Sequence, residues 1–292
     1  MSPQMRPRRS VLYMPASNAR AVEKARSLPC DVVILDLEDA VAPDAKPAAR
    51  QAAAEAVAAG GFGPREVVVR VNGLATEWGS EDLAVIAAAG PDAILVPKVN
   101  SAADVAAYDA AIKSAPERTR LWAMIETCPA VFGLPDIAAC AGASRLSALV
   151  MGINDLAKEM GARQTPGREP FWAAMSLTVA AARAHGLLAL DGVHNEIDDL
   201  AALETVCGQG RDFGFDGKSL IHPTHLDIAN RVFSPEPGEV AWSRAVIAAF
   251  EAPENAGRGA LRVEGRLAEH LHLGQARKLV ALSEAIAART AA

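Results

Sequence analysis

The chain has few cysteines, and they are widely separated. Cys30, Cys128, Cys140 and Cys207 are its four cysteines in 292 residues, and no pair has C-x-x-C spacing. Such spacing is typical of zinc sites and thiol redox motifs, so the pattern favours neither. Scattered single cysteines are typical of reduced packing residues, because thiols stay reduced in the cytosol. We therefore expect a soluble, cytoplasmic protein.

Long basic and long apolar runs are also lacking. The net charge is −6 and the pI is about 5.6, and the densest basic cluster is Arg6, Arg8 and Arg9. Binding to nucleic acid or to an anionic membrane needs a basic face that neutralises phosphates. The apolar run at 11–14 ends at Pro15, too short for a signal sequence or a membrane span. We expect no nucleic-acid partner and no membrane association.

Several cofactor and catalytic motifs are incomplete. Segment 207–214 has a G-x-G, but three residues separate it from the next glycine, and it precedes a strand instead of following one. The G-K-S at 217–219 lacks the earlier glycine of a phosphate loop, because Asp212 stands there. A G-x-S-x-G elbow is absent, which argues against an α/β-hydrolase triad. Packing or surface roles are favoured over zinc binding for four histidines: His222, His225, His270 and His272.

What the sequence does contain is a repeating strand and helix pattern. Hydrophobic residues make up 51% of the chain, enough for a large core. Short apolar runs, most of them separated by alanine-rich stretches with helical periodicity, are SVLYMP, VVILDL, VVVRVN, AILVPKV, RLWAMIET, ALVMGIND, LLALDGV and FDGKSLIH. Eight such units predict a closed parallel barrel, the α/β fold called a (β/α)8 TIM barrel, over residues 1–235.

The residues after the barrel have a different character. Pro and Gly are dense at 232–239, and a helix, a hairpin with Glu264 and Gly265 at its tip, and a final helix are expected to follow. Residues 236–292 are too few for a second catalytic domain. We interpret this segment as a lid or an oligomerisation arm that would exclude water from an active site.

Each apolar run ends in polar residues, which a barrel would bring to one rim. These are Ser17, Asp36 with Glu38, Arg70 with Asn72, Lys98, Glu126, Asn154 with Asp155, Asp191, and Lys218 with His222. The carboxyl ends of barrel strands form the face that carries the active site in enzymes of this fold. The acids that follow the buried run at 32–35 would therefore lie at a mouth instead of in a core.

Glu126 and Asp155 end the fifth and sixth runs, on strands about 5 Å apart. Two converging carboxylates without a nearby Cys or His are typical of Mg²⁺, which keeps its other positions for water and substrate. The alternative is a carboxylate pair that forms ion pairs with Arg70 or Lys98.

Arg70 has apolar neighbours on both sides, and an inward guanidinium at a barrel mouth can bind a carboxylate or stabilise an enolate oxygen. It could equally be a structural partner of Glu38, and the two roles are compatible.

These residues lie in stretches that resemble the citrate lyase β-subunit family of the HpcH/HpaI aldolase superfamily, which includes malyl-CoA and citramalyl-CoA lyases. The stretches are RSVLYMPAS, LDLEDAVAPDAK, VRVNG, PKV, IET, GINDLAKEMG, GFDGKSLIHP, and the hairpin GRL at 265–267. They run in order through nearly the whole chain. They are specific for the family and much less specific for the substrate.

The resemblance implies roles for particular residues. Glu126 and Asp155 would bind Mg²⁺, with Mn²⁺ as a possible substitute, and Arg70 would contact the substrate. Glu38 and Asp39 would orient Arg70 and metal-bound water. Lys24 would contact coenzyme A phosphates, and Pro223, which ends the last barrel stretch, is assigned to the same substrate and CoA site. Family members are commonly trimers or larger homo-oligomers, with the lid closing over a neighbouring subunit.

The implied reaction is the reversible carbon–carbon cleavage of a 3-hydroxyacyl-CoA, such as malyl-CoA, citramalyl-CoA or citryl-CoA, into an acyl-CoA and an α-keto acid. Alternatives are a malyl-CoA thioesterase, an aldolase for free acids, and a subunit that acts on an acyl-carrier partner. Two departures from the family bear on this choice: the loop at 15–24 reads PASNARAVEK instead of PGSRP or PGNRP, and Glu269 stands where an aspartate is the usual acid/base. A change of one methylene at such a position can cost about 100-fold in rate.

Overall fold

The structure, a computed structural model, describes residues 6–290. By its internal contacts the chain divides into two compact units. One is Arg8–Phe233, and the other contains the described C-terminal residues from Ser234 onwards together with Arg6 and Pro7. Each unit is described by itself below.

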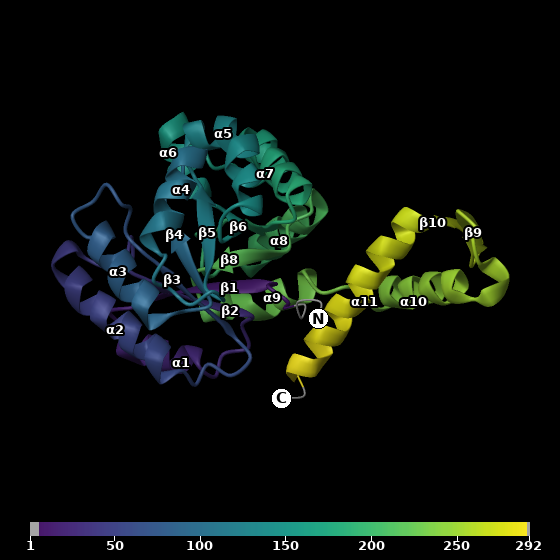
Figure 1. Cartoon of the computed structure of the whole chain (residues 1–292), viewed down its shortest axis with the longest axis horizontal. Coiled ribbons are helices and arrows are strands. Elements are labelled where there is room, and N and C mark those ends of the chain that lie inside the picture. Colours follow the sequence, from purple (N-terminus) through teal and green to yellow (C-terminus); the bar gives the residue numbers. More distant parts are fainter. Residues whose placement is uncertain (1–5, 291–292) are drawn as a thin grey trace. The chain divides into compact units, whose positions relative to one another are not determined.

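Residues 8–233 form a closed barrel of eight parallel strands in sequence order, as predicted (Figure 1). The barrel closes because β1 pairs with both β2 and β8. The eight predicted runs supply the strands, which are β1 Ser10–Pro15, β2 Val32–Asp36, β3 Glu66–Arg70, β4 Ala93–Val96, β5 Arg120–Ile125, β6 Leu146–Met151, β7 Leu188–Asp191 and β8 Gly217–Leu220.

Helices surround the barrel and connect successive strands (Figure 1). Ser101 and Thr127 cap two of them, since each side chain accepts a hydrogen bond from the backbone N–H three residues later. The helices are α1 Ala19–Ala25, α2 Lys46–Ala59, α3 Gly79–Ala89, α4 Ala102–Ala111, α5 Cys128–Ala139, α6 Ile153–Met160, α7 Trp172–Ala184, α8 Leu200–Phe213 and α9 Leu226–Val232, with short 3₁₀ turns η1 Pro43–Ala45, η2 Cys140–Gly142, η3 Glu169–Phe171 and η4 Pro223–His225.

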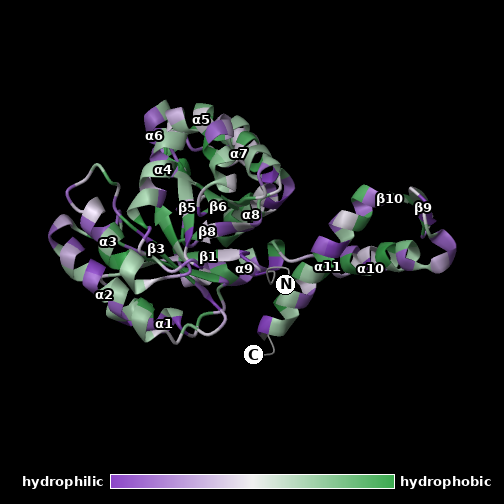
Figure 2. Ribbon diagram, in the orientation of Figure 1, coloured by the Kyte–Doolittle hydropathy of each residue, from purple (hydrophilic) through white to green (hydrophobic). Residues whose placement is uncertain are grey.

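Both faces of the barrel strands are buried, which explains why the runs are apolar throughout instead of alternating. In β2, Val33 and Leu35 pack in the layer between sheet and helices, whereas Val32 and Ile34 belong to a second cluster. That second cluster also contains Trp122, which is fully buried. The strands are accordingly mostly coloured as hydrophobic in Figure 2. A packed interior leaves the ends of the strands as the place for polar side chains.

The C-terminal unit contains the predicted helix, hairpin and final helix: α10 Pro237–Glu251, η5 Pro253–Asn255, β9 Ala260–Val263, β10 Arg266–Glu269 and α11 His270–Thr290. Glu264 and Gly265 join β9 to β10 and both have positive φ, of 47° and 83°, as a tight hairpin turn requires. Val246, Leu261, Val263, Ala268 and Ala276 form its own small core. The predicted lid role stays a prediction.

Two details of the rim differ from the sequence prediction. Asp155 lies in the first turn of α6 instead of at the end of β6. Lys218 is the second residue of β8, opposite Asp191 of β7, and its side chain is fully buried. A run of apolar and polar letters does not reveal where a strand ends when a helix follows it directly.

Within residues 6–290, no helix combines the length and the apolar character that a membrane crossing requires.

Candidate active site at the carboxyl ends of the strands

A cavity of about 270 Å³ lies among residues that end or follow six barrel strands, β2, β3 and β5 to β8. It contains four of the residues predicted for the site: Asp39, Arg70, Glu126 and Asp155. The side chains that line it are Tyr13, Asp36, Asp39, Ala40, Arg70, Met124, Glu126, Met151, Gly152, Ile153, Asn154, Asp155, Val193, Asn195, Ser219 and Ile221.

Arg70 is held at the end of β3 by Asp36, the last residue of β2, and by two carboxylates of the LEDAV segment, residues 37–41, that follows it. Asp36 is its register partner on β2, and Nε and Nη2 of Arg70 each donate to one oxygen of Asp36 at 2.6 Å. Nη1 lies 2.8 Å from Glu38 Oε2 and 3.2 Å from Asp39 Oδ2. Burial alone would lower the pKa of Arg70, but the hydrogen bonds that it donates to Asp36 and the nearby negative charges raise its pKa well above the usual value. Arg70 is therefore a fixed, permanent cation, stacked 4.9 Å from the ring centre of Tyr13.

A second polar network, centred on Lys46, contacts the backbone of the LEDAV segment. The buried ammonium of Lys46 donates to the carbonyl oxygens of Leu37 and Glu38 at 2.9 and 2.7 Å, and to Asn72 Oδ1 at 2.7 Å. Asn72 in turn donates to Asp82 at 2.6 Å. Every donor of Lys46 has a partner, so this network fixes the backbone that carries Glu38 and Asp39.

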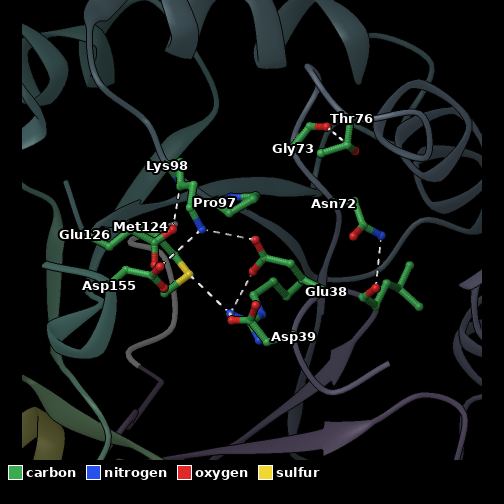
Figure 3. A network of polar contacts seen from close by, with 12 residues as sticks. Glu38, Asp39, Asn72, Gly73, Thr76, Pro97, Lys98, Met124, Glu126 and Asp155 are labelled. Atoms are coloured by element: carbon green, nitrogen blue, oxygen red, sulfur yellow. Dashed lines mark hydrogen bonds and ion pairs between the residues drawn. The ribbon is translucent and has the colours of Figure 1, made fainter. Parts of the chain in front are cut away.

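Glu126 follows β5, and its carboxylate is almost fully buried. Oε1 accepts the backbone N–H of Lys98 at 2.8 Å. Gly152 leaves the room that the carboxylate uses, because a Cβ at this position would lie 2.4 Å from Glu126 Oε2. The side chain of Asp155, in the first turn of α6, is about one third exposed. Figure 3 shows the Glu126 and Asp155 carboxylates on the same side of the cluster.

Lys98 lies between the carboxylates on the two sides of the site (Figure 3). Its Nζ is 3.5 Å from Asp155 Oδ1 and 3.7 Å from Glu38 Oε1. The ion pair of Asp155 with Lys98 and that of Glu38 with Arg70 are the contacts that the structural alternatives anticipated. Asp155, Arg70 and Glu126 also line the cavity, where a metal or a substrate would reach them.

The cluster carries more negative than positive charge. Asp36, Glu38, Asp39, Glu126 and Asp155 are five acids, and Arg70 and Lys98 are the two cations that pair with them. Burial, then the charge of Asp39, raises the pKa of Glu38 to about 7, although Arg70 and Lys98 oppose the shift. Burial, then the charge of Glu38, raises the pKa of Glu126 to about 7, against Lys98. A cation bound here would offset this excess of negative charge.

The residues present fit a Mg²⁺ ion that keeps water and substrate as ligands. Glu126 and Asp155 supply two oxygen ligands, and in the described part of the chain no group of three or more His, Cys, Asp or Glu side chains is arranged to hold a metal. A closed structural zinc site is thereby disfavoured. An oxygen-only site with two protein carboxylates is typical of Mg²⁺.

The other predicted site residues lie elsewhere. Lys24 is an exposed residue of α1, and Pro223 begins η4 after β8. Neither of them lines the cavity, although Ile221, two residues before Pro223, does. Glu269 ends β10 in the C-terminal unit, where its N–H donates to His272 Nδ1 at 2.9 Å. The roles assigned to Lys24, Pro223 and Glu269 stay predictions.

Three residues of the site were not among the predicted site residues. The sequence indicates that Asp36 is a rim acid, but its bidentate contact with Arg70 depends on strand register. The sequence also offers Lys98 as an ion-pair partner, yet its positive φ of 50° has no signal in the sequence. Tyr13 belongs to the predicted β1 run, and period-two patterning does not show that its ring faces Arg70.

Comparison with curated proteins finds relatives of full length. A (3S)-malyl-CoA thioesterase of Cereibacter sphaeroides is 49% identical over 288 residues, which cover 99% of both chains. An L-malyl-CoA/beta-methylmalyl-CoA lyase of the same species is 36% identical over 313 aligned positions, covering 98% of both chains.

Comparison with solved structures finds the same fold. The CitE protein of Mycobacterium tuberculosis in complex with magnesium, acetoacetate and coenzyme A matches with a TM-score of 0.73 and 30% identity, over 95% of this chain and 98% of that one. A citrate lyase of Burkholderia xenovorans matches with a TM-score of 0.81 over 96% of this chain and 92% of that one; at 20% identity it supports the fold alone. A family model covers residues 9–223, nearly all of the barrel, and this chain belongs to the family that it describes, HpcH/HpaI aldolase/citrate lyase.

Proposed function

We propose that this protein is a Mg²⁺-dependent enzyme that hydrolyses the thioester of a 3-hydroxyacyl-CoA of the malyl-CoA type. One observation carries the proposal. Arg70, Glu126 and Asp155 meet at one cavity in a chain that is 49% identical, over 99% of its length, to (3S)-malyl-CoA thioesterase. Coenzyme A as part of the substrate is further supported by the CitE neighbour, which binds magnesium and coenzyme A.

The proposed site supplies three things to the substrate. A Mg²⁺ ion held by Glu126 and Asp155 would act as a Lewis acid on oxygens of the hydroxy-acid end. The guanidinium of Arg70 stabilises negative charge that develops on a carbonyl oxygen, and it costs little reorganisation because Asp36 already holds it by two hydrogen bonds of 2.6 Å. Glu38 and Asp39 form ion pairs with Nη1 of Arg70 and so fix the orientation of the guanidinium.

Hydrolysis also requires a group that takes a proton from the attacking water. Water adds to the thioester carbonyl, the C–S bond breaks, and the thiolate leaves and is protonated as free coenzyme A. We assign the proton acceptor to Glu269, following the position of the acid/base in the family. The assembly that would bring Glu269 to a site, a homo-oligomer with a closing lid, is part of the proposal.

Carbon–carbon cleavage is the second candidate. It is favoured by the full-length match, at 36% identity, to an L-malyl-CoA/beta-methylmalyl-CoA lyase. In that reaction a base removes the hydroxyl proton, the bond between the hydroxyl-bearing carbon and the carbon next to the thioester breaks, and Arg70 stabilises the thioester enolate. The same cation site and the same arginine serve both reactions, so the products distinguish them.

The test is product analysis with (3S)-malyl-CoA and Mg²⁺ by mass spectrometry. Malate and free coenzyme A mean hydrolysis, whereas glyoxylate and acetyl-CoA mean carbon–carbon cleavage. Glu126→Gln is the inactive comparison, and Lys113→Met, in the exposed turn that follows α4, is the matched surface control. Intact malyl-CoA after incubation with folded, Mg²⁺-supplied wild type would overturn both candidates and favour a substrate attached to a carrier protein or a free acid.

A further inference from the structure

We propose that Lys98 competes with the divalent cation for Asp155 and thereby sets the affinity of the metal site. The inference rests on the cation site of the proposed function. It assigns to Lys98 the part of an internal cation that must move away when the metal binds. Lys98 is then a positioning residue for the metal and not a metal ligand.

The backbone of Lys98 already serves the site. Lys98 has a φ of 50°, in the left-handed region that residues other than glycine seldom adopt. In this conformation its N–H donates to Glu126 Oε1 at 2.8 Å. The turn after β4 therefore orients one proposed metal ligand through the main chain of Lys98 and leaves the side chain to reach the other.

The side chain of Lys98 is held loosely. Its Nζ lies 3.5 Å from Asp155 and 3.7 Å from Glu38, distances longer than those of ordinary hydrogen bonds. About half of the side chain (49%) is exposed. The ammonium can thus leave Asp155 for water at little cost, because it loses no close hydrogen bond to a carboxylate.

Two other lysines of the barrel show what a fixed ammonium looks like. Lys46 and Lys218 are buried, and each donates to a carboxylate, amide or carbonyl oxygen at 2.7 to 2.9 Å. Neither pairs with Glu126 or Asp155. Lys98 therefore differs from both in burial, in distance and in its partner, and it is the lysine suited to exchange with another cation.

Electrostatics gives the direction of the effect. An ammonium and a divalent cation that share Asp155 repel one another, so the ammonium lowers metal affinity until it moves away. Because Lys98 is half exposed, solvent screens this repulsion, and we expect a change of about five-fold or more instead of several orders of magnitude.

The experiment is a titration of Mn²⁺ into full-length protein, with free Mn²⁺ measured by electron paramagnetic resonance at constant pH and ionic strength. Lys98→Met keeps the length of the side chain and removes its charge, and we expect its dissociation constant to fall by about five-fold or more. Lys98→Arg keeps the charge, so its Mn²⁺ dissociation constant should stay within about two-fold of the wild-type value. Lys113→Met removes a charge from the exposed turn that follows α4 and should not change the Mn²⁺ dissociation constant.

Each outcome has a defined meaning. Tighter Mn²⁺ binding by Lys98→Met, with Lys98→Arg near wild type, supports the inference. Unchanged or weaker binding by a Lys98→Met protein that keeps its circular dichroism spectrum overturns it, while loss of binding in Glu126→Gln shows in the same series that the site itself is correct. If wild type and Lys98→Met both bind no Mn²⁺, or if Glu126→Gln binds as well as wild type, the proposed site fails, and with it the inference.

Discussion

Two charged clusters at the carboxyl ends of the barrel strands differ in how completely their charges are paired. At β7 and β8, Asp191 receives both Nη1 hydrogen bonds of Arg168 at 2.8 Å and the ammonium of Lys218 at 2.9 Å. At β2 to β6, the LEDAV acids, Glu126 and Asp155 outnumber their partners Arg70 and Lys98. The first cluster is closed by short contacts within the protein, and the second leaves carboxylates that face a cavity.

The pKa shifts in the two clusters have opposite signs. Burial would raise the pKa of Asp191, but Lys218 and Arg168 hold it below its usual value. Burial and neighbouring acids raise the pKa of Glu38 and of Glu126 to about 7. The acid of the first cluster is therefore neutralised inside the protein by two cations, whereas the acids of the second cluster are suited to bind a further cation. An excess of carboxylates over cations, not the presence of acids, distinguishes the second cluster from the first.

Glu126→Gln should give the largest effect, on activity. It removes one of two proposed metal ligands, so we expect turnover of the thioester to fall by about 1,000-fold, the share of catalysis that a Lewis-acid metal supplies. Steady-state kinetics with saturating Mg²⁺ measure this. A variant that keeps more than about a tenth of wild-type turnover would place the metal elsewhere.

Asp191→Asn should give the largest effect on stability. The substitution leaves Arg168 and Lys218 buried beside a neutral side chain, which costs about 3–5 kcal/mol. Urea denaturation measures the free energy of unfolding, and Asp216→Asn, at a half-exposed ion pair with Arg183, is the matched control. If Asp191→Asn lowers the free energy of unfolding no more than Asp216→Asn does, the Asp191 cluster does not stabilise the fold as proposed.

Arg70→Lys should lower turnover by about 100-fold while the protein stays folded. Lysine keeps the charge but cannot make the two parallel hydrogen bonds to Asp36, so its ammonium is not held in place. Turnover and the Mn²⁺ dissociation constant are measured together. Weaker Mn²⁺ binding, with turnover that saturating Mg²⁺ restores to the wild-type value, would assign Arg70 to the metal site instead of to the substrate.

The smallest effect is on the pH dependence of stability. Glu38 and Glu126 titrate near pH 7 in the folded protein and near 4.5 in the unfolded chain, so between these values the folded state binds more protons. Stability without added metal should therefore fall as pH rises from 5 to 7.5, by about 2 kcal/mol for each of the two groups, and the melting temperature should fall with it. Calorimetry in EDTA measures it, and Mg²⁺ should stabilise more at pH 7.5 than at pH 5. If Glu38→Gln and Glu126→Gln leave the change of stability with pH as it is in wild type, these two glutamates are not its cause.

The sequence was most informative where strands are buried on both faces. Continuous apolar runs located all eight strands, and polar residues at their ends pointed to Arg70, Glu126 and Asp155. It was least informative about register and backbone conformation. The pairing of Asp36 with Arg70 depends on which residues of β2 and β3 face each other, and the N–H of Lys98 reaches Glu126 through a left-handed φ. The sequence predicts Lys218 at the rim because it is polar. The sequence has no sign that the ammonium contacts Asp191 and the carbonyl oxygen of Gly192 while the side chain is fully buried.

The most direct test of the account is anomalous X-ray diffraction from crystals of the wild-type protein grown with Mn²⁺. We expect an anomalous peak within about 2.5 Å of carboxylate oxygens of both Glu126 and Asp155, with Lys98 Nζ moved away from Asp155. A peak bound by other residues, or none at this pair in crystals that contain Mn²⁺ elsewhere, would contradict the claim that the acid-rich cluster is the cation site.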